Sequence, residues 1–450
     1  MTTARTLAFA TVAVLVVAAP ASAAWDPPAR ASRGPLPAGS PDVAVNARGD
    51  AVAAWVRGAR RDAAIVVSTR PAGQAWGEPV AISRRGRPAI GPKVAIDPQG
   101  RVVVVWRQVV RTRFVTTGAG RRRQAVYVAR ARERLVSETR WSPISTLSSD
   151  RHKVGPPEVG VDGRGGVLVA WHWGTGTSPA DPGFVGRVQY VERPADGDWS
   201  SPRRLSRSGL CTEVRLPRVA VGAQGNAVVW WQCDLSGVRS TAMAVSRAPG
   251  SPLGAETQLP FRQAGDVAAD LAVAPSGRAV AVSAASDGTL SWWRGDVGPA
   301  LSLNALAALA TDERIDTDAG PPRVAVNTTG DALSAWTDLL GRPRAAPIAA
   351  DLGVGSPTSL DDAGIDLGGA VVAVGDGRQG AVAWFADGRA RAAMRAATGD
   401  LDPAATISGP GVVARDPVAL AMDASGQAVA LWTRAVGNRT VVERAATAAP

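Results

Sequence analysis

The sequence predicts an all-β fold, a β-propeller of eight four-stranded blades around one axis, spanning residues 24–450 as a single domain. Three observations support this prediction. One phrase of about 15 residues recurs eight times, a second phrase follows several of its copies, and the segment after residue 24 resembles the end of that second phrase. A repeat period near ~50 residues is typical of propellers and solenoids.

The first phrase predicts a β-hairpin in each repeat. Two apolar runs flank a four-residue turn that often begins with Asn or Asp and usually has Gly fourth, which suits a short hairpin loop. Runs that are apolar on both faces indicate strands buried on both sides. Trp ends seven copies and Ser283 ends the eighth, and these end positions lie 51, 65, 60, 52, 53, 48 and 48 residues apart. The copies span 41–55, 92–106, 157–171, 217–231, 269–283, 322–336, 370–384 and 417–432.

The second phrase predicts the two outer strands of a blade. It is clearest at 63–83, 125–148 and 187–206, where two further strand patterns are joined by a polar turn. Four antiparallel strands per ~50 residues make one propeller blade.

The two ends of the chain complement each other. Trp25 and the segment 29–32 match the fourth-strand phrase, whereas the chain stops after a third strand. We therefore predict that the N-terminal segment completes the eighth blade and hides two sheet edges. A seven-bladed ring is the alternative, if the copy ending at Ser283 is not a full blade.

The pattern W-S-x-P-x-x-L-S, as at 141–148, carries a family resemblance. Across nearly all of residues 24–450 the chain resembles the β-propeller superfamily, and this element is similar to those of sialidase-like and lectin-like propellers. The resemblance implies the architecture. The sialidase repeat S-x-D-x-G-x-T-W has no match, and segment 283–293 is the nearest departure from it.

Residues 1–23 predict a secretory signal peptide. Arg5 precedes an apolar run over 7–19, and Ala-Ser-Ala at 21–23 fits the cleavage rule. Thirteen residues span about 20 Å as a helix, less than the ~30 Å bilayer core. We therefore expect a secreted, extracellular protein without a membrane span. The excess of 48 Arg over 2 Lys indicates a bacterial, GC-rich source.

Eleven of the 15 tryptophans occupy repeat positions, where apolar residues are typical of a core. We predict that they pack between blades. They are Trp25, Trp55, Trp76, Trp106, Trp141, Trp171, Trp199, Trp231, Trp336, Trp384 and Trp432.

Variable connections predict where a ligand binds. Strand direction alternates, so the links between second and third strands and those between blades share one end, where we expect loops at 84–91, 107–124, 149–156, 172–186 and 207–216. Segment 84–140 has 15 basic and 3 acidic residues. An arginine-rich loop can bind polyanions, although a merely solvated loop is the alternative. The candidate ligand residues are Arg107, Arg111, Arg113, Arg121, Arg122 and Arg123.

His152, His172 and Trp173 are further ligand candidates. We expect the two histidines in loops of neighbouring blades, where they could meet, and Trp173 in an irregular insert, where its indole could stack on a sugar. Solvated side chains and loop packing are the alternatives. We predict no metal site and no cofactor.

Cys211 and Cys233 lie on opposite arms of the fourth hairpin. An even pair of cysteines in a secreted protein predicts a disulfide.

No G-x-S-x-G, H-E-x-x-H or P-loop motif is present. We therefore predict a non-enzymatic binding or scaffold protein for a glycan, an anionic cell-envelope polymer or a protein, and do not expect a nucleic acid. The rival class is a propeller glycoside hydrolase or lyase, since the separation of two carboxylates is a tertiary property. The oligomeric state stays open.

Overall fold

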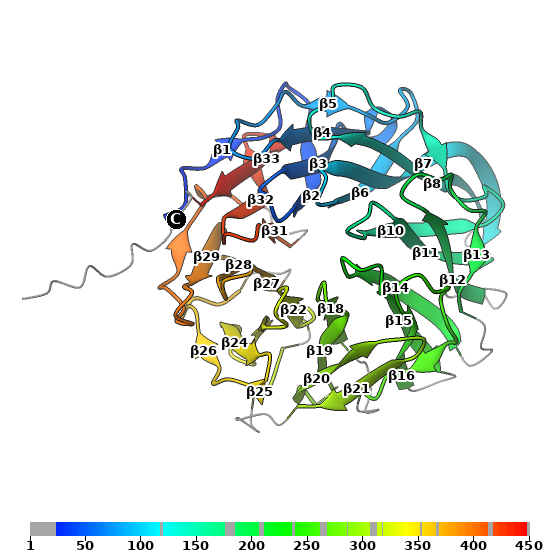
Figure 1. The fold of residues 1–450 in the computed structure, drawn as a ribbon. Helices are drawn as coiled ribbons and strands as arrows, with labels where there is room; N and C mark the ends of the chain where they lie inside the picture. Colours follow the sequence, from blue (N-terminus) through cyan, green and yellow to red (C-terminus); the bar gives the residue numbers. More distant parts are fainter. Residues whose placement is uncertain are drawn as a thin grey trace, which may run out of the picture.

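The computed structural model describes residues 24–447, apart from 118–119, 176–184, 207–210, 236–238, 262–267, 286, 307–312, 317, 352, 366–368 and 413–416. The predicted signal peptide, 1–23, lies outside the described residues. Eight antiparallel sheets form a ring, and the innermost strand of each sheet faces the axis (Figure 1). The predicted eight-bladed β-propeller is confirmed.

Each of the first four blades has three longer strands and a two-residue outer strand. Blade 1 consists of β2 (Ala38–Val45), β3 (Ala51–Arg57), β4 (Ala64–Arg70) and β5 (Val80–Ala81), with a short 3-10 helix at Arg60–Asp62. Blade 2 consists of β6 (Ala89–Ile96), β7 (Arg101–Thr117), β8 (Gly120–Leu135) and β9 (Ser145–Thr146). Blade 3 consists of β10 (Lys153–Val161), β11 (Val167–Thr175), β12 (Val185–Arg193) and β13 (Arg203–Arg204). Blade 4 consists of β14 (Cys211–Val221), β15 (Ala227–Leu235), β16 (Arg239–Arg247) and β17 (Thr257–Gln258).

Among the other four blades, blades 5, 6 and 8 differ in their outer strands, whereas blade 7 repeats the first pattern. Blade 5 consists of β18 (Ala268–Val273), β19 (Arg278–Ala284), β20 (Leu290–Val297) and β21 (Leu301–Ala305). Blade 6 consists of β22 (Arg323–Val326), β23 (Ala332–Thr337) and β24 (Pro343–Ala349), with two short strands on β24, β25 (Gly353–Val354) and β26 (Thr358–Ser359). Blade 7 consists of β27 (Val371–Val374), β28 (Gly380–Ala386), β29 (Arg389–Arg395) and β30 (Ala405–Thr406). Blade 8 consists of β31 (Ala419–Met422), β32 (Ala428–Val436), β33 (Arg439–Ala446) and β1 (Ala29–Arg30).

The inner hairpins close with the turns that the sequence predicts. The Asp97 carboxylate accepts the backbone N–H of Arg101 at 2.7 Å, and the Asp162 carboxylate accepts that of Gly166 at 2.7 Å. Gly100, fourth in its turn, has a φ of +85°, a conformation that glycine adopts at little steric cost. These side chains therefore hold the hairpin ends of blades 2 and 3 by local hydrogen bonds.

The serine that ends the second phrase finishes the sheet after the outer strand. Its hydroxyl accepts a backbone N–H of the third strand, at 3.0 Å from Ile65 to Ser83 and 2.8 Å from Ala129 to Ser148. The serine therefore takes the place of a longer outer strand, because it satisfies a backbone donor of the third strand that the short outer strand leaves unpaired.

The predicted tryptophan packing is confirmed. The seven tryptophans of the hairpin end position are at most 1% exposed, and the other four pack against clusters of buried residues. Blade 5 has Ser283 at this position. There the Trp293 indole donates to the Ser283 hydroxyl at 3.0 Å, and Trp292 packs 5.8 Å from Trp336, centroid to centroid. Two rings from β20 thus fill the core, and blade 5 is a complete blade.

The ring closes as predicted. In blade 8, Ala29 and Arg30 of β1 pair with Arg444 and Glu443 of β33, and the hydroxyl of Ser32 accepts the Val442 N–H at 3.0 Å. The first and last described strands therefore share one sheet.

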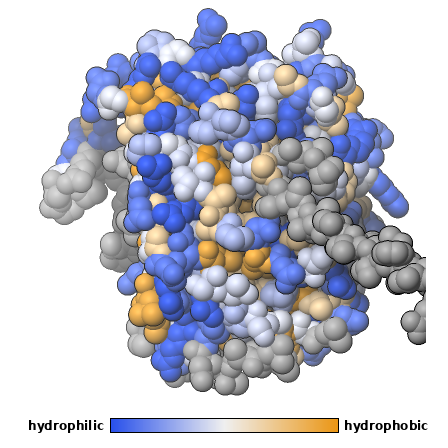
Figure 2. Space-filling view, turned by 90° about the vertical axis from the view of Figure 1, so that its left-hand side faces the viewer, coloured by the Kyte–Doolittle hydropathy of each residue, from blue (hydrophilic) through white to orange (hydrophobic). Residues whose placement is uncertain are grey.

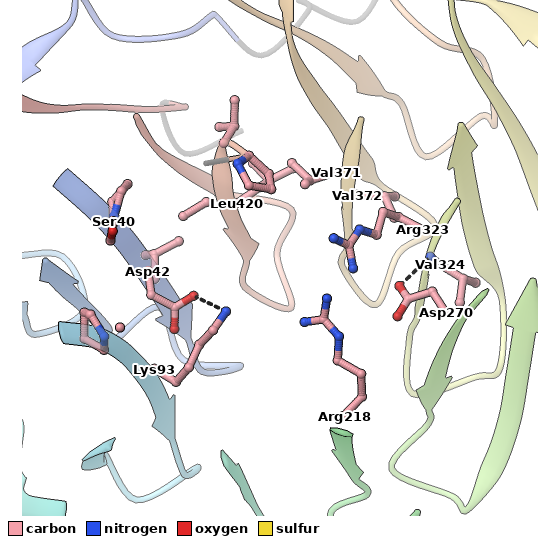
Figure 3. Close-up of a pocket in the computed structure, with 17 residues that line it drawn as sticks. Ser40, Asp42, Lys93, Arg218, Asp270, Arg323, Val324, Val371, Val372 and Leu420 are labelled. Atoms are coloured by element: carbon pink, nitrogen blue, oxygen red, sulfur yellow. Dashed lines mark hydrogen bonds and ion pairs between the residues drawn. The ribbon is translucent and has the colours of Figure 1, made fainter. Parts of the chain in front are cut away.

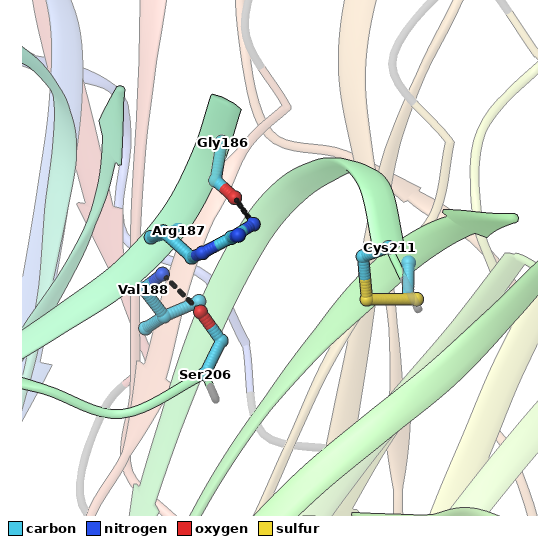
Figure 4. The surroundings of a disulfide bond; sticks show 6 residues. Gly186, Arg187, Val188, Ser206 and Cys211 are labelled. Carbon is cyan, nitrogen blue, oxygen red and sulfur yellow. Dashed lines mark hydrogen bonds between the residues drawn. A yellow bond between two sulfur atoms is a disulfide. The ribbon is translucent and has the colours of Figure 1, made fainter. Parts of the chain in front are cut away.

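The predicted disulfide joins Cys211 to Cys233 with 5.1 Å between the Cα atoms. Figure 4 shows it beside β12, where the Ser206 hydroxyl accepts the Val188 N–H at 3.0 Å. Both sulfur-bearing residues are buried, at 5% and 0% exposure.

Hydrophilic residues cover most of the outer wall seen in Figure 2, and apolar residues appear there in separate patches. Within the described part of the chain, no helix has the length and apolar character needed to cross a bilayer.

Candidate functional site

A basic pocket of about 280 Å³ lies between the β7–β8 hairpin and the start of β10. It brings together four of the predicted ligand residues, Arg107, Arg113, Arg123 and His152, with Lys153 and Tyr127. We call this hollow the basic pocket. It lies at the end of the ring where one blade connects to the next. This end is opposite the β6–β7 turn, and β7 runs from that turn toward it.

The hairpin corrects one prediction. Segment 107–124 was expected to be a loop, but β7 and β8 pair from Arg101 and Leu135 out to Thr117 and Gly120. The segment is a two-stranded ribbon that carries its arginines on paired strands. Its outer part is rich in arginine and threonine and has no regular apolar alternation, so the usual strand pattern is missing.

Parts of the other expected loops are strands too. Residues 89–91 belong to β6, 153–156 to β10, and 172–175 to β11. Residues 211–216 belong to β14, whereas the described remainder at 84–88 and 149–152 is irregular. In each case the inner or second strand extends past the point where apolar residues stop, because pairing with the neighbouring strand continues.

The arginines of the basic pocket are bound by neutral groups. Arg113 donates to the side-chain oxygen of Gln124 at 3.3 Å, and Arg123 donates to the Thr112 hydroxyl at 3.3 Å. Arg107 donates to the Val154 carbonyl at 3.4 Å and lies over the Tyr127 ring at 5.2 Å. No carboxylate lines the pocket among its described residues. Burial lowers the pKa of Arg107, which reflects the cost of removing its charge from water.

The remaining predicted arginines lie outside this pocket. Arg111 forms an ion pair with Asp150 at 2.9 Å, which neutralises it. Arg121 stacks over Phe114 at 4.4 Å, and the Phe114 ring is 60% exposed. Arg122 belongs to β8, but its side chain lies outside the described residues.

The prediction of a loop is confirmed for His152, which lies in the irregular connection just before β10, and is wrong for His172, which lies within β11 of blade 3. His152 packs edge-on against Trp173, 4.3 Å between ring centroids. Trp173 is part of β11, paired with Val154 and Arg187, and packs against a buried cluster. Trp173 is therefore a half-buried strand residue that packs against His152 of the basic pocket, and it is not a loop residue.

A second pocket, of about 360 Å³, lies on the axis among the inner strands. Its charged residues occupy one equivalent position in successive inner strands, thirteen residues before the end of each copy of the first phrase. Taken around the ring, this position holds Asp42, Lys93, Glu158, Arg218, Asp270, Arg323, Val371 and Ala419. Charges alternate in sign over six blades and stop at blades 7 and 8. We call these six charged residues the axial ring.

Backbone bulges orient the axial-ring residues of blades 1 to 4. The pairing register shifts just before the ring residue in blades 1 to 4, as between Gly39 and Asp42 and between Ile90 and Lys93. A proline precedes each ring residue there, as Pro41 and Pro92 do, and proline cannot donate to the ladder. The bulge turns the following side chain toward the axis.

The acids of the axial ring bind to the next blade. Asp42 accepts the Val94 N–H at 2.8 Å and lies 3.5 Å from the Lys93 ammonium. Asp270 accepts the Val324 N–H at 3.1 Å, and Glu158 pairs with Arg218 at 3.4 Å. Burial raises the pKa of Asp42, although Lys93 and the amide oppose this shift. Asp42 in turn raises the pKa of Lys93.

Our reading of the sequence missed the axial ring. The signal was available, because the second residue of the repeated phrase is charged in six copies. A charged residue inside an apolar run that repeats at one position is informative once the run is known to face an axis. Among the described residues, no group of three or more His, Cys, Asp or Glu side chains is placed to hold a metal ion.

No protein-family profile and no curated protein matches the chain. Its fold is similar to that of a lectin from Burkholderia pseudomallei, with 12% identity over 83% of this chain and 100% of the lectin and a TM-score of 0.50. A Hadza microbial sialidase shares 13% identity over 81% of this chain and 74% of its own, with a TM-score of 0.43. A protein of unknown function from Dyadobacter fermentans shares 10% identity over 92% and 95%, with a TM-score of 0.45. These similarities concern the fold, and the chain is a β-propeller whose structural neighbours include lectins and sialidases.

Proposed function

We propose that the protein is a secreted, non-enzymatic binding protein that holds an acidic polysaccharide, or another anionic cell-envelope polymer, at the basic pocket. One observation carries this proposal. Arg107, Arg113, Arg123 and Lys153 surround one hollow that no carboxylate lines among its described residues. An anion entering the hollow would meet charge-assisted donors.

The length of the β7–β8 ribbon favours a polymer over a small ion as the ligand. Beyond the pocket, Arg121 and the exposed Phe114 ring continue the cationic and aromatic surface toward the hairpin tip. A cation beside an exposed aromatic ring can contact both the charge and the apolar face of a sugar. The ligand would then follow the hairpin, with one charged unit seated in the pocket.

Salt dependence is the first test of the ligand class. The Debye length falls to about 10 Å at 0.1 M salt. Attraction of an anion to exposed arginines therefore weakens as the salt concentration rises. We expect residues 24–450 to bind anionic glycans and cell-wall polymers at low salt, to release them at high salt, and to leave neutral glycans unbound. If no polymer binds at either salt, the proposal fails, and capture of a protein would support the scaffold class instead.

The double change Arg113→Gln and Arg123→Gln tests the location. Both side chains have neutral partners, so their removal strands no buried carboxylate. We expect affinity for the anionic polymer to fall at least about tenfold, or about 1.4 kcal/mol, in a titration at low salt.

The matched control is Arg140→Gln with Arg164→Gln. It removes the same charge from exposed turn residues at the opposite end of the ring. Equal loss of affinity in both double variants would mean that only net charge matters, and the assigned location would be wrong.

The proposed location outside the cell draws support from the disulfide, since such bonds persist in oxidising compartments. Detection of the protein in the culture medium, with the chain beginning near Ala24, is the expected result. Retention in the cytoplasm with reduced cysteines would contradict it.

The hydrolase or lyase class has one observation in its favour. Asp42 and Asp270 both line the axial pocket, and burial raises the pKa of Asp42, as in groups that serve as general acids. This class expects fragments to be released from a glycan, and release to stop in Asp42→Asn. Binding without release, unaffected by Asp42→Asn, would favour the binding class.

A further inference from the structure

Arg323 is the cation of the axial ring that makes no ion-pair contact with its neighbours among the described residues. Lys93 pairs with Asp42 and Arg218 pairs with Glu158. The third acid, Asp270, accepts the backbone N–H of Val324, and the described residues place no ion-pair partner on the Arg323 guanidinium. Burial lowers the pKa of Arg323; the negative charge of Asp270 opposes this shift, and the positive charge of Arg218 adds to it.

Two guanidiniums face each other in the axial pocket. Figure 3 shows Arg218 and Arg323 pointing toward one another from β14 and β22, with Asp270 set to one side on β18. Like charges that converge in a partly desolvated space repel each other unless an anion lies between them. A planar guanidinium presents a fork of donors that matches a carboxylate.

The part of the pocket wall that blades 7 and 8 contribute is apolar. Blades 7 and 8 interrupt the charge alternation and contribute Val371, Val372, Val418 and Leu420 to the lining. The volume of about 360 Å³ is that of a dozen water molecules at ~30 Å³ each. The occupant is therefore a small molecule with a charged end and a short apolar body.

The acids of the axial ring limit the charge of the occupant. Three carboxylates and three cations leave the ring without net charge, so one anion between Arg218 and Arg323 gives the occupied ring a single net negative charge. A second negative charge would face Asp42, Glu158 and Asp270 without a free cation, and like charges at close range repel.

We infer that the axial pocket binds a small monocarboxylate, with its carboxylate between Arg218 and Arg323 and its apolar body against Val371 and Val372. This site is separate from the basic pocket, and the inference does not rest on the polymer-binding proposal. An inorganic oxyanion offers the same oxygen donors but has no apolar body.

Fluorine NMR of trifluorobutyrate is a direct test. We expect line broadening on addition of residues 24–450, and displacement by butyrate but not by butylamine or butanol. Succinate and inorganic phosphate should displace it at least tenfold less well. Equal displacement by phosphate would overturn the apolar part of the inference, and absence of broadening would overturn the site.

Arg323→Gln is expected to weaken trifluorobutyrate binding at least tenfold, while polymer binding at the basic pocket is unchanged. Conversely, the Arg113→Gln and Arg123→Gln protein should bind trifluorobutyrate normally. The charge-matched control is Arg439→Gln, on β33, whose guanidinium contacts the Gly34 carbonyl. Loss of binding in this control, or normal binding in Arg323→Gln, would contradict the assignment.

Val371→Asp supplies a second test that does not depend on removing Arg323. The new carboxylate extends the alternation of charge into blade 7 and gives Arg323 a partner from its own ring position. We expect a folded protein with an unchanged or higher melting temperature that no longer binds trifluorobutyrate. Retained binding would show that Arg323 is not the anion site. Should Arg323→Gln fail to fold, Arg323→Lys takes its place, and tenfold weaker binding is again the expected result.

Discussion

His172 shows how close packing by one neighbour sets the chemistry of a residue. Gly155 of β10 lies over it so closely that a Cβ on this glycine would come within 2.9 Å of the His172 Cβ. This burial lowers the pKa of His172 to about 4, and the positive charge of Lys153 adds to the shift. At neutral pH the imidazole is therefore uncharged in the folded protein.

The lowered pKa of His172 predicts a loss of stability in acid. Above pH ~6.5 the imidazole is neutral in both the folded and the unfolded chain. As pH falls from about 6.5 toward 4, His172 becomes protonated in the unfolded chain but stays neutral in the folded protein. The free energy of unfolding therefore decreases, by up to about 3 kcal/mol below pH 4. His172→Gln removes this contribution. Urea titrations at pH 7 and pH 4.5 should show the variant gaining stability relative to the wild type as pH falls, and an equal difference at both values would contradict the prediction.

At the scale of the element, blade 2 stands apart by the length of its β7–β8 hairpin and blade 4 by the irregular pairing of β14 with β15. The β7–β8 hairpin extends far beyond the ring core, and only pairing between its two strands supports its outer part. In blade 4, β14 and β15 are also long, but two register shifts interrupt their pairing, on either side of Val214. The disulfide crosses this interrupted region and joins the two strands where the hydrogen-bond ladder is irregular.

Removal of the disulfide is expected to destabilise the protein. A covalent link between residues 22 positions apart is worth about 3 kcal/mol in the chain-entropy account. Cys211→Ala with Cys233→Ala should lower the urea midpoint accordingly without changing the fold seen by circular dichroism. Addition of reductant should lower the wild type toward the variant and leave the variant unchanged. An unaltered midpoint in the double variant would mean that the ladder alone holds this hairpin.

At the scale of the whole molecule, stability depends on closure of the ring. Ala31 donates its backbone N–H to the Val442 carbonyl at 2.9 Å and is 2% exposed, next to Trp55 and Val66 of blade 1. The N-terminal segment therefore joins blade 8 to blade 1 as well as completing its own sheet. Without it, β33 would be an exposed edge, which favours pairing with another molecule.

Deletion of residues 24–34 tests this closure. We expect a lower melting temperature and concentration-dependent association, measured by scanning calorimetry and light scattering. A synthetic peptide of the same residues should restore the melting temperature by occupying the vacant edge, whereas a peptide with Ala31→Asp should not, because it would bury a charge. An unchanged melting temperature after deletion would show that closure contributes little.

The fold was predictable because its signals are local and repeated. The turn residues around Asp97 and Gly100 and the serine at position 148 act on neighbouring backbone groups, so short stretches of sequence reveal them. The long hairpin was not predicted, because its exposed outer part has no buried face to impose an apolar alternation. His172 and Trp173 were expected in a loop because they lie beyond Trp171, the last residue of the repeated phrase, although β11 continues through them.

By itself, the sequence determined the repeated blade, the inner hairpins, the closing strand and the cysteine pair, whereas the structure decided between eight blades and seven. Each of these follows from which residues recur at one spacing. Only the tertiary structure decided which charges meet. Asp42, Lys93, Arg218, Asp270 and Arg323 come from five different repeats, and Arg107, Arg113, Arg123 and His152 come from two blades. The reason is physical: a repeat specifies its own strands, whereas charge compensation depends on distances across the ring, which exist once the blades have closed around the axis.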